Sequence, residues 1–324
     1  MPRLAYILAA SHSGSTLLAM LLNAHPEVCS VGELKATNLG DVERYRCSCG
    51  TLIRACPFWT AVGLEMGRRG FPFEITDART DFPRSADGAY AERLLRPLHR
   101  GRVLESVRDV ALLLSPGWRS GLRRVQQRNL ALVETLCELT GARVIVDSSK
   151  VGMRLKYLLR NPALDIKVIR LVRDGRAVAL TYMNPAAFAD AQDPSLRGGG
   201  CGCDRPGEGL SLAQAARAWR RSNEEAENLL ATLDPARWTS IRYEDLCASP
   251  KEALAGLFTF LGLDPGKVAD DFRTVEHHVL GNGMRLDGTA EVRLDDRWKS
   301  VLTPHDLAVF ESVAGRLNRQ YGYQ

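Results

Sequence analysis

The sequence contains no apolar run long enough to span a membrane, and its cysteines are few. Eight cysteines in 324 residues exclude a small disulfide scaffold, and two C-x-C pairs are more typical of a reducing compartment than of a secreted framework. The apolar stretch at residues 4–10 is short for a signal peptide and runs directly into a polar loop. We therefore expect a cytoplasmic protein without a membrane span.

An excess of charge of one sign is also nearly absent. The chain has 43 Lys and Arg against 38 Asp and Glu, a net charge of +5. So small an excess does not require nucleic acid as a partner, although it suits a pocket for a small polyanion. With 45% apolar and 25% charged residues, the composition is that of an ordinary globular chain, which excludes disorder and collagen-like repetition. A chain this long can bury a core without metal or disulfide bonds.

Strand and helix patterns alternate along the chain, which predicts an α/β fold with a parallel sheet and helices on both faces. The predicted strands are residues 4–9, 28–31, 143–146, 166–172 and 239–242. The predicted helices are residues 16–24, 89–114, 119–140, 174–182 and 250–261, with others opened by residues 147–150, by Ser211 and by Thr303-Pro304. Residues 41–87 read as irregular and residues 184–209 as a mobile loop. We expect one domain over residues 1–324, with helical insertions at about 60–140.

A polar loop, Ser11-His12-Ser13-Gly14-Ser15-Thr16, joins the first predicted strand to the first helix. The first amides of a helix have no intrahelical partner and lie at the positive end of its dipole, so this loop is typical of an anion site. The Walker sequence is absent because Ser15 stands in place of its lysine, and the Rossmann glycine pattern is absent as well. A strand–helix turn without a ligand is the alternative.

Four blocks of sequence follow one another along the chain. They are Ser-Gly-Ser-Thr-Leu-Leu at 13–18 with Ala-His-Pro-Glu-Val at 24–28 and Gly-Glu at 32–33, then residues 169–178, residues 241–246, and residues 281–285 with 297–299. In this order the blocks resemble sulfotransferases that use 3'-phosphoadenosine 5'-phosphosulfate (PAPS), especially protein-tyrosine sulfotransferases and bacterial members. The resemblance implies a P-loop-like parallel sheet flanked by helices.

The resemblance also implies which residues bind the donor. They are Ser13, Gly14, Ser15 and Thr16 around the 5'-phosphosulfate, Arg173 and Thr181 at the 3'-phosphate, and Arg285 at the nucleotide. Threonine at 181 replaces the usual serine, and either hydroxyl can donate a hydrogen bond. Arg176 is expected to form an ion pair with Asp174 or Glu244, with ligand contact as the alternative.

Three further residues are implied to act in catalysis. At position 12 the family usually has Arg or Lys to neutralise the leaving oxygen, whereas this chain has His12, either as a cation or as a neutral hydrogen-bond donor. Glu33, from the Gly-Glu pair, is the candidate general base that takes the proton of the acceptor hydroxyl. Lys150 is a candidate cation for the sulfate. Ordinary surface roles are the alternative for Glu33 and Lys150.

The cysteines raise a separate question. Enough thiolates for a zinc site are supplied by Cys47, Cys49 and Cys56 together with Cys201 and Cys203. Their spacing is not that of a standard zinc knuckle. Free thiols or a local disulfide are the alternatives.

Taken with the resemblance, the sequence predicts an enzyme that moves a sulfuryl group from PAPS to a small-molecule or peptide hydroxyl, with no metal required. A nucleotide-dependent phosphotransferase on the same core would need a Walker lysine and a carboxylate for Mg²⁺. A non-catalytic anion-binding protein is the second alternative.

Overall fold

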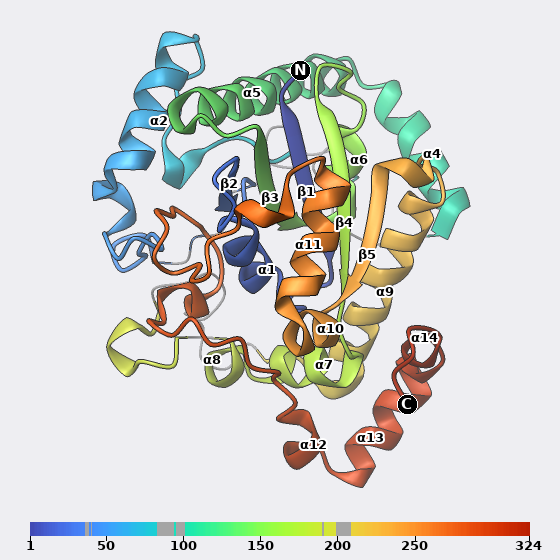
Figure 1. Cartoon of the computed structure of the whole chain (residues 1–324). Coiled ribbons are helices and arrows are strands. Elements are labelled where there is room, and N and C mark those ends of the chain that lie inside the picture. The colour runs from blue at the N-terminus through green and yellow to red at the C-terminus, as the bar shows by residue number, and fades with distance from the viewer. Residues whose placement is uncertain (36–38, 40, 83–93, 95–100, 190, 199–208) are drawn as a thin grey trace.

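A five-stranded parallel sheet forms the centre of the molecule (Figure 1). The computed structural model describes the whole chain except residues 36–38, 40, 83–93, 95–100, 190 and 199–208. The strands are β1 (Arg3–Ala9), β2 (Val28–Gly32), β3 (Val144–Lys150), β4 (Asp165–Val172) and β5 (Trp238–Arg242). Their order in the sheet is β2-β3-β1-β4-β5, and every neighbouring pair is parallel. The predicted fold class, a P-loop-like parallel sheet flanked by helices, is confirmed.

Helices cover both faces of the sheet. Those of the described residues are α1 (Ser15–Leu22), α2 (Pro57–Arg68), α4 (Gly101–Leu113), α5 (Pro116–Thr140), α6 (Gly152–Leu158), α7 (Gly175–Met183), α8 (Pro185–Phe188), α9 (Leu212–Leu230), α10 (Tyr243–Ala248), α11 (Pro250–Leu261), α12 (Trp298–Val301), α13 (Pro304–Phe310) and α14 (Arg316–Gln320). A π-helical turn, Glu311–Gly315, links the last two. Short 3-10 turns are Ile53–Ala55, Ile75–Asp77, Pro194–Leu196, Pro235–Arg237, Pro265–Lys267 and Gly283–Leu286.

The central strand β1 shows why the sheet is buried on both sides. Its side chains alternate between faces, so Ala5 and Ile7 pack with α1, α10 and α11, whereas Leu4 and Tyr6 pack with α2, α5 and α6. Both sets are almost fully buried, which explains the continuous apolar run in the sequence. In Figure 1, α1 and α11 lie in front of the sheet.

Two sequence predictions were wrong. Residues 147–150 do not open a helix, because β3 continues through them in register with β1 and ends at Lys150. Residues 41–87 are not irregular throughout, because they contain α2, which begins at Pro57 and buries Trp59, Val62 and Met66 on one face. The i, i+3, i+7 spacing of those three residues was the missed helical signal.

Other element ends agree closely with the sequence. Ser115 accepts a hydrogen bond from Trp118 N and caps α5, and Ser211 forms a capping box with Gln214 at the start of α9. The predicted helix at 89–114 lies partly outside the described residues, and its described part contains α4. The predicted mobile loop at 184–209 is likewise described only in part, and that part includes α8.

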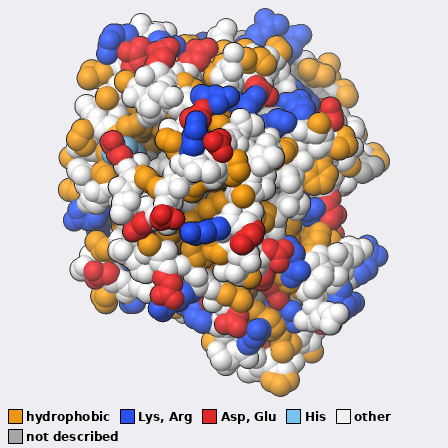
Figure 2. Space-filling view, viewed as in Figure 1, with side chains coloured by type: hydrophobic (Ala, Val, Ile, Leu, Met, Phe, Trp, Pro, Cys, Tyr) orange, Lys and Arg blue, Asp and Glu red, His pale blue; other side chains and the backbone are white. Residues whose placement is uncertain are grey.

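The surface in Figure 2 mixes basic and acidic side chains, without a broad field of one sign. Among the described residues, no helix combines the length and the apolar character needed to cross a membrane.

Candidate functional site

A pocket of about 950 Å³ opens at the carboxyl ends of the strands. Each strand supplies the lining residue at its end or just after it: His12 after β1, Glu33 after β2, Lys150 at the end of β3, Arg173 after β4 and Tyr243 after β5. The carboxyl ends of parallel strands meet at one edge, where ligands of α/β proteins bind. The structure therefore brings four predicted site residues, from four different strands, into one cavity.

The loop between β1 and α1 places the first turn of α1 against this pocket. Gly14 precedes α1 in the left-handed region with φ of 90°, and a Cβ there would lie 2.4 Å from a ring carbon of Tyr243. Any other residue would be strained at this φ, and its Cβ would collide with Tyr243, so only glycine fits here. Gly14, Ser15 and Thr16 line the pocket, whereas Ser13 is 1% exposed and is not part of the lining. Among the described residues, Ser13 Oγ has no hydrogen-bond partner.

Glu33 lies between two lysines. Lys150 donates a hydrogen bond to Glu33 Oε1, and Lys35 Nζ lies 3.6 Å from Glu33 Oε2. Burial raises the pKa of Glu33, but the charges and hydrogen bonds of Lys150 and Lys35 leave the pKa below its ordinary value. Glu33 is therefore ionised at neutral pH, which is the state that a proton acceptor requires.

His12 is neutral at pH 7 in this structure. Its ring meets the ring of Tyr182 edge to face, with 4.8 Å between centroids. Loss of hydration, followed by the charges of Lys150 and Arg173, lowers the pKa of His12 to about 3. Of the two states that the sequence leaves open, the surroundings favour the neutral hydrogen-bond donor.

Arg173 is held from three sides. Its Nη1 donates to the carbonyl oxygen of His12 at 2.9 Å, and its Nη2 donates to Asp295 Oδ2 at 2.9 Å. The guanidinium also lies over the Tyr243 ring, 4.4 Å from the centroid. Thr181, on α7, lines the same pocket, and its Oγ1 donates to the carbonyl of Ala177 at 3.1 Å. The hydroxyl hydrogen of Thr181 is thus used within α7, and it must turn away from Ala177 to donate to a ligand in the pocket.

Sequence reasoning missed the carboxylate that holds Arg173. Asp295 also accepts hydrogen bonds from Arg297 Nε at 2.6 Å and Arg297 Nη2 at 3.0 Å. Burial raises the pKa of Asp295, but the hydrogen bonds from Arg297 and Arg173 lower it to about 2. Arg297 belongs to a block that resembles the family, which was the available signal. Asp295 carried no such signal, because its partner Arg173 is 122 residues away.

Comparison with known proteins agrees with this geometry. A sequence model described as "Sulfotransferase family" matches residues 133–266. Carbohydrate sulfotransferase 2 of Homo sapiens is 32% identical over 196 residues, which cover 52% of this chain and 37% of that protein. The chain is thus similar to sulfotransferases over part of its length.

Other relatives extend the comparison to the whole fold. Carbohydrate sulfotransferase 3 of Homo sapiens is 28% identical over 181 residues, covering 52% of this chain and 36% of that protein. The chain thus spans little more than a third of the curated relatives it matches. Among solved structures, the sulfotransferase domain from the curacin biosynthetic pathway has a TM-score of 0.52 and 20% identity, covering 100% of this chain and 99% of that one. The sulfotransferase STF9 from Mycobacterium avium has a TM-score of 0.51 and 12% identity, and the match covers 100% of this chain and 78% of that one. These two likenesses show the fold.

Arg285, like Ser13, is a predicted site residue that does not line the pocket. Its side chain is 1% exposed, and its Nη1 donates to the carbonyls of Gly281 at 2.6 Å and Asn282 at 2.9 Å. Its Nη2 donates to the carbonyl of Arg46. The expected nucleotide contact is therefore not seen, because backbone carbonyls surround the guanidinium, which joins two loops instead.

Arg176 behaves as the sequence predicts. Its Nε and Nη2 bind Asp174 Oδ1 at 3.0 Å and Oδ2 at 2.7 Å, and it does not line the pocket. The expected ion pair with Asp174 is confirmed.

Proposed function

We propose that this protein transfers a sulfuryl group from PAPS to an acceptor hydroxyl. The observation that carries the proposal is the convergence of Glu33, Lys150, Arg173 and Thr181 on a helix N-terminus within one pocket. Lysine and arginine outnumber carboxylates along the lining, as suits a polyanionic nucleotide. One buried polar atom of the lining, Arg173 Nε, has no partner among the described residues and fits a bound anion.

The donor would be held at two points. Gly14, Ser15 and Thr16 at the start of α1 would hold the 5'-phosphosulfate through backbone amides and hydroxyls. Arg173 and Thr181 would hold the 3'-phosphate by charge-assisted and neutral hydrogen bonds. PAPS supplies the activated sulfuryl group, and these residues position it.

Glu33 is proposed to remove the proton of the acceptor hydroxyl as its oxygen bonds to sulfur. The bond between sulfur and the bridging oxygen breaks, and 3',5'-bisphosphoadenosine leaves with the bonding electron pair. Lys150 then faces the sulfuryl oxygens, and His12 donates a hydrogen bond toward the leaving oxygen. The Lys150–Glu33 contact keeps the base ionised until the acceptor arrives.

The acceptor is proposed to be a small-molecule or peptide hydroxyl. A sugar hydroxyl is the first to test, since two curated relatives are carbohydrate sulfotransferases. We further propose that residues 1–324 work as one domain in the cytoplasm, without nucleic acid.

The direct test is an assay with PAPS and sugar, phenol and peptide hydroxyls, read by mass spectrometry. We expect a mass gain of one sulfuryl group on an acceptor and equal initial rates in EDTA and in Mg²⁺, because side-chain cations neutralise the charge. A strict Mg²⁺ requirement with ATP as the donor would instead identify a phosphotransferase.

Binding of 3',5'-bisphosphoadenosine should be much tighter than binding of 5'-AMP. A charge-assisted bond from Arg173 to the 3'-phosphate contributes about 1.5–3 kcal/mol, or about 10- to 150-fold in Kd. Calorimetry should show this gap in the native protein and a smaller gap in Arg173→Ala.

The matched control is Arg176→Ala, which removes a neighbouring arginine that does not line the pocket. We expect this variant to keep the preference for the 3'-phosphate. Equal affinity of the native protein for the two nucleotides would refute the role of Arg173.

A further inference from the structure

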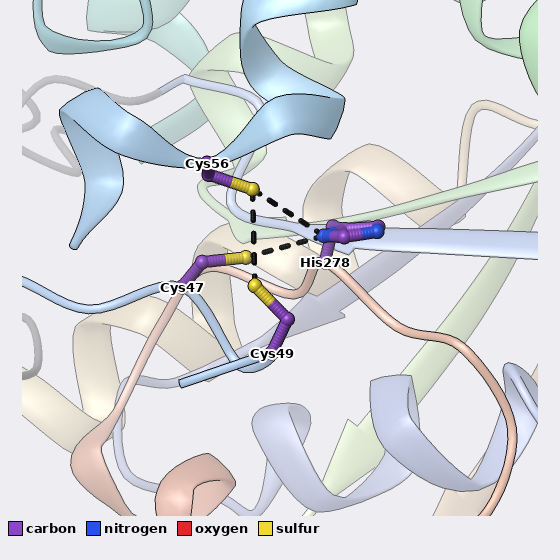
Figure 3. Close-up of side chains that lie close together, drawn as sticks. All are labelled: Cys47, Cys49, Cys56 and His278. Atoms are coloured by element: carbon purple, nitrogen blue, oxygen red, sulfur yellow. Dashed lines mark hydrogen bonds between the residues drawn. The ribbon is translucent and has the colours of Figure 1, made fainter. Parts of the chain in front are cut away.

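Three cysteines and one histidine converge on a single point outside the pocket (Figure 3). Cys47 and Cys49 come from one turn, Cys56 immediately precedes α2, and His278 comes from the segment before the Gly283–Leu286 turn. The four potential ligand atoms all lie within 4.8 Å of one another. The sequence offered the three cysteines but gave no sign of His278, which lies 222 residues after Cys56.

The spacing of these atoms fits a tetrahedral metal site. His278 Nδ1 lies 3.6 Å from Cys47 Sγ and 3.5 Å from Cys56 Sγ, and Cys49 Sγ lies 3.8 Å from Cys56 Sγ. Around a tetrahedral zinc ion with ordinary bond lengths, two sulfurs are about 3.8 Å apart, and a sulfur and a nitrogen about 3.6 Å. A disulfide would bring two sulfurs to about 2 Å. The observed separations therefore match metal ligands rather than a bonded pair.

The surroundings of His278 also suit a ligand. Its second nitrogen, Nε2, lies 2.9 Å from Glu276 Oε1, and a carboxylate there orients a metal-bound imidazole with Nδ1 toward the ion. The ring stacks on Phe58 with 4.3 Å between centroids and an interplanar angle of 2°. Cys47 and Cys56 are fully buried, while Cys49 is exposed and leaves one side open for metal entry.

We infer that Cys47, Cys49, Cys56 and His278 bind one structural zinc ion. Three thiolates and one imidazole favour zinc over Mg²⁺ or Ca²⁺, which prefer oxygen ligands. Four protein ligands complete a tetrahedron and leave no position for a substrate, so the ion has a structural role. This inference does not depend on the proposed reaction.

The site would fasten one wall of the pocket. Ser48, between two of the cysteines, accepts a hydrogen bond from Val279 N at 2.7 Å and donates one to the carbonyl of His277 at 3.0 Å. Shortly after, Asn282 N donates to Thr16 Oγ1 at 3.4 Å, at the first turn of α1. The zinc ion would thus join the cysteine turn to the segment that carries Asn282 to the pocket.

The test is the metal content of the full chain, purified without a histidine tag under reducing conditions and measured by plasma mass spectrometry. We expect about one zinc ion per chain, and near-complete loss of zinc in Cys49→Ser, whose exposed side chain is the least disruptive to replace. Cys247→Ser, at a half-buried cysteine elsewhere, should keep the full amount.

Two further measurements locate the ion. The double variant Cys201→Ser/Cys203→Ser should retain zinc, because the four ligands named here suffice; loss of zinc in it would overturn the assignment. Amide hydrogen exchange at residues 276–286 should be faster in Cys49→Ser than in Cys247→Ser.

Native protein purified without zinc would refute the site. This holds whether its thiols all titrate freely or mass spectrometry finds a disulfide between Cys49 and Cys56. Because metal content is read on the unmodified chain, a variant that fails to fold does not affect this outcome.

Discussion

Glu33→Gln should lower turnover about 10²–10⁴-fold without weakening the binding of 3',5'-bisphosphoadenosine. The amide keeps the shape of the side chain but cannot accept the proton of the acceptor hydroxyl. The affinity for 3',5'-bisphosphoadenosine should stay the same or rise slightly. Lys150 and Lys35 lose the carboxylate that neutralises them, so the pocket becomes more positive. The turnover number at saturating donor and the Kd from calorimetry would separate the two effects.

The pH dependence adds a second readout. The pKa of Glu33 is below its ordinary value, so native activity should be lost only as pH falls through that lowered pKa. His12, with a pKa of about 3, should add no inflection near neutrality. Glu291→Gln is the matched control, since it replaces an exposed pocket carboxylate and should leave turnover nearly unchanged.

His12→Arg decides between the two candidate bases. Arginine cannot accept a proton near neutral pH, so an active His12→Arg enzyme excludes the histidine as the base. A folded but inactive His12→Arg enzyme beside an active Glu33→Gln enzyme would reverse the assignment.

Arg154→Met should reduce the free energy of unfolding by about 3–5 kcal/mol. Arg154 is 1% exposed, and its Nε donates to the fully buried Asp147 Oδ2 at 3.1 Å. Its other nitrogens donate to the carbonyl of Thr80 at 2.6 Å and to Asn129 Oδ1 at 2.8 Å. Methionine fills similar space but leaves a buried carboxylate uncompensated and two buried acceptors without donors. Urea denaturation would measure the change.

Arg160→Met is the control for that experiment. Arg160 is exposed, and it pairs with Asp109 Oδ2 at 3.0 Å. Loss of this ion pair should reduce the free energy of unfolding by about 1 kcal/mol or less. Equal effects of the two substitutions would contradict the view that the Arg154–Asp147 pair organises the end of β3.

The sequence was sufficient for the five strands, for most of the helices along the chain, and for most of the predicted site residues that line the pocket. Each depends on local pattern: β1 is a continuous apolar run, Gly14 is followed at once by α1, and Glu33 and Arg173 stand directly after strand ends. In a parallel sheet such positions converge at one edge whatever lies between them in the chain. Glu33 and Arg173, which the family resemblance named, lie at such positions and line the pocket.

Only the tertiary structure decided the features that depend on distant neighbours. The lowered pKa of His12 follows from burial of its ring and then from the charges of Lys150 and Arg173, which no local pattern places beside it. Arg285 stood in a recognisable block, yet carbonyls from two loops enclose it. His278 joins the three cysteines only because its segment packs against their turn. Charge state, burial and ligand geometry are set by atoms within a few ångströms, and in a folded chain most of those atoms come from far along the sequence.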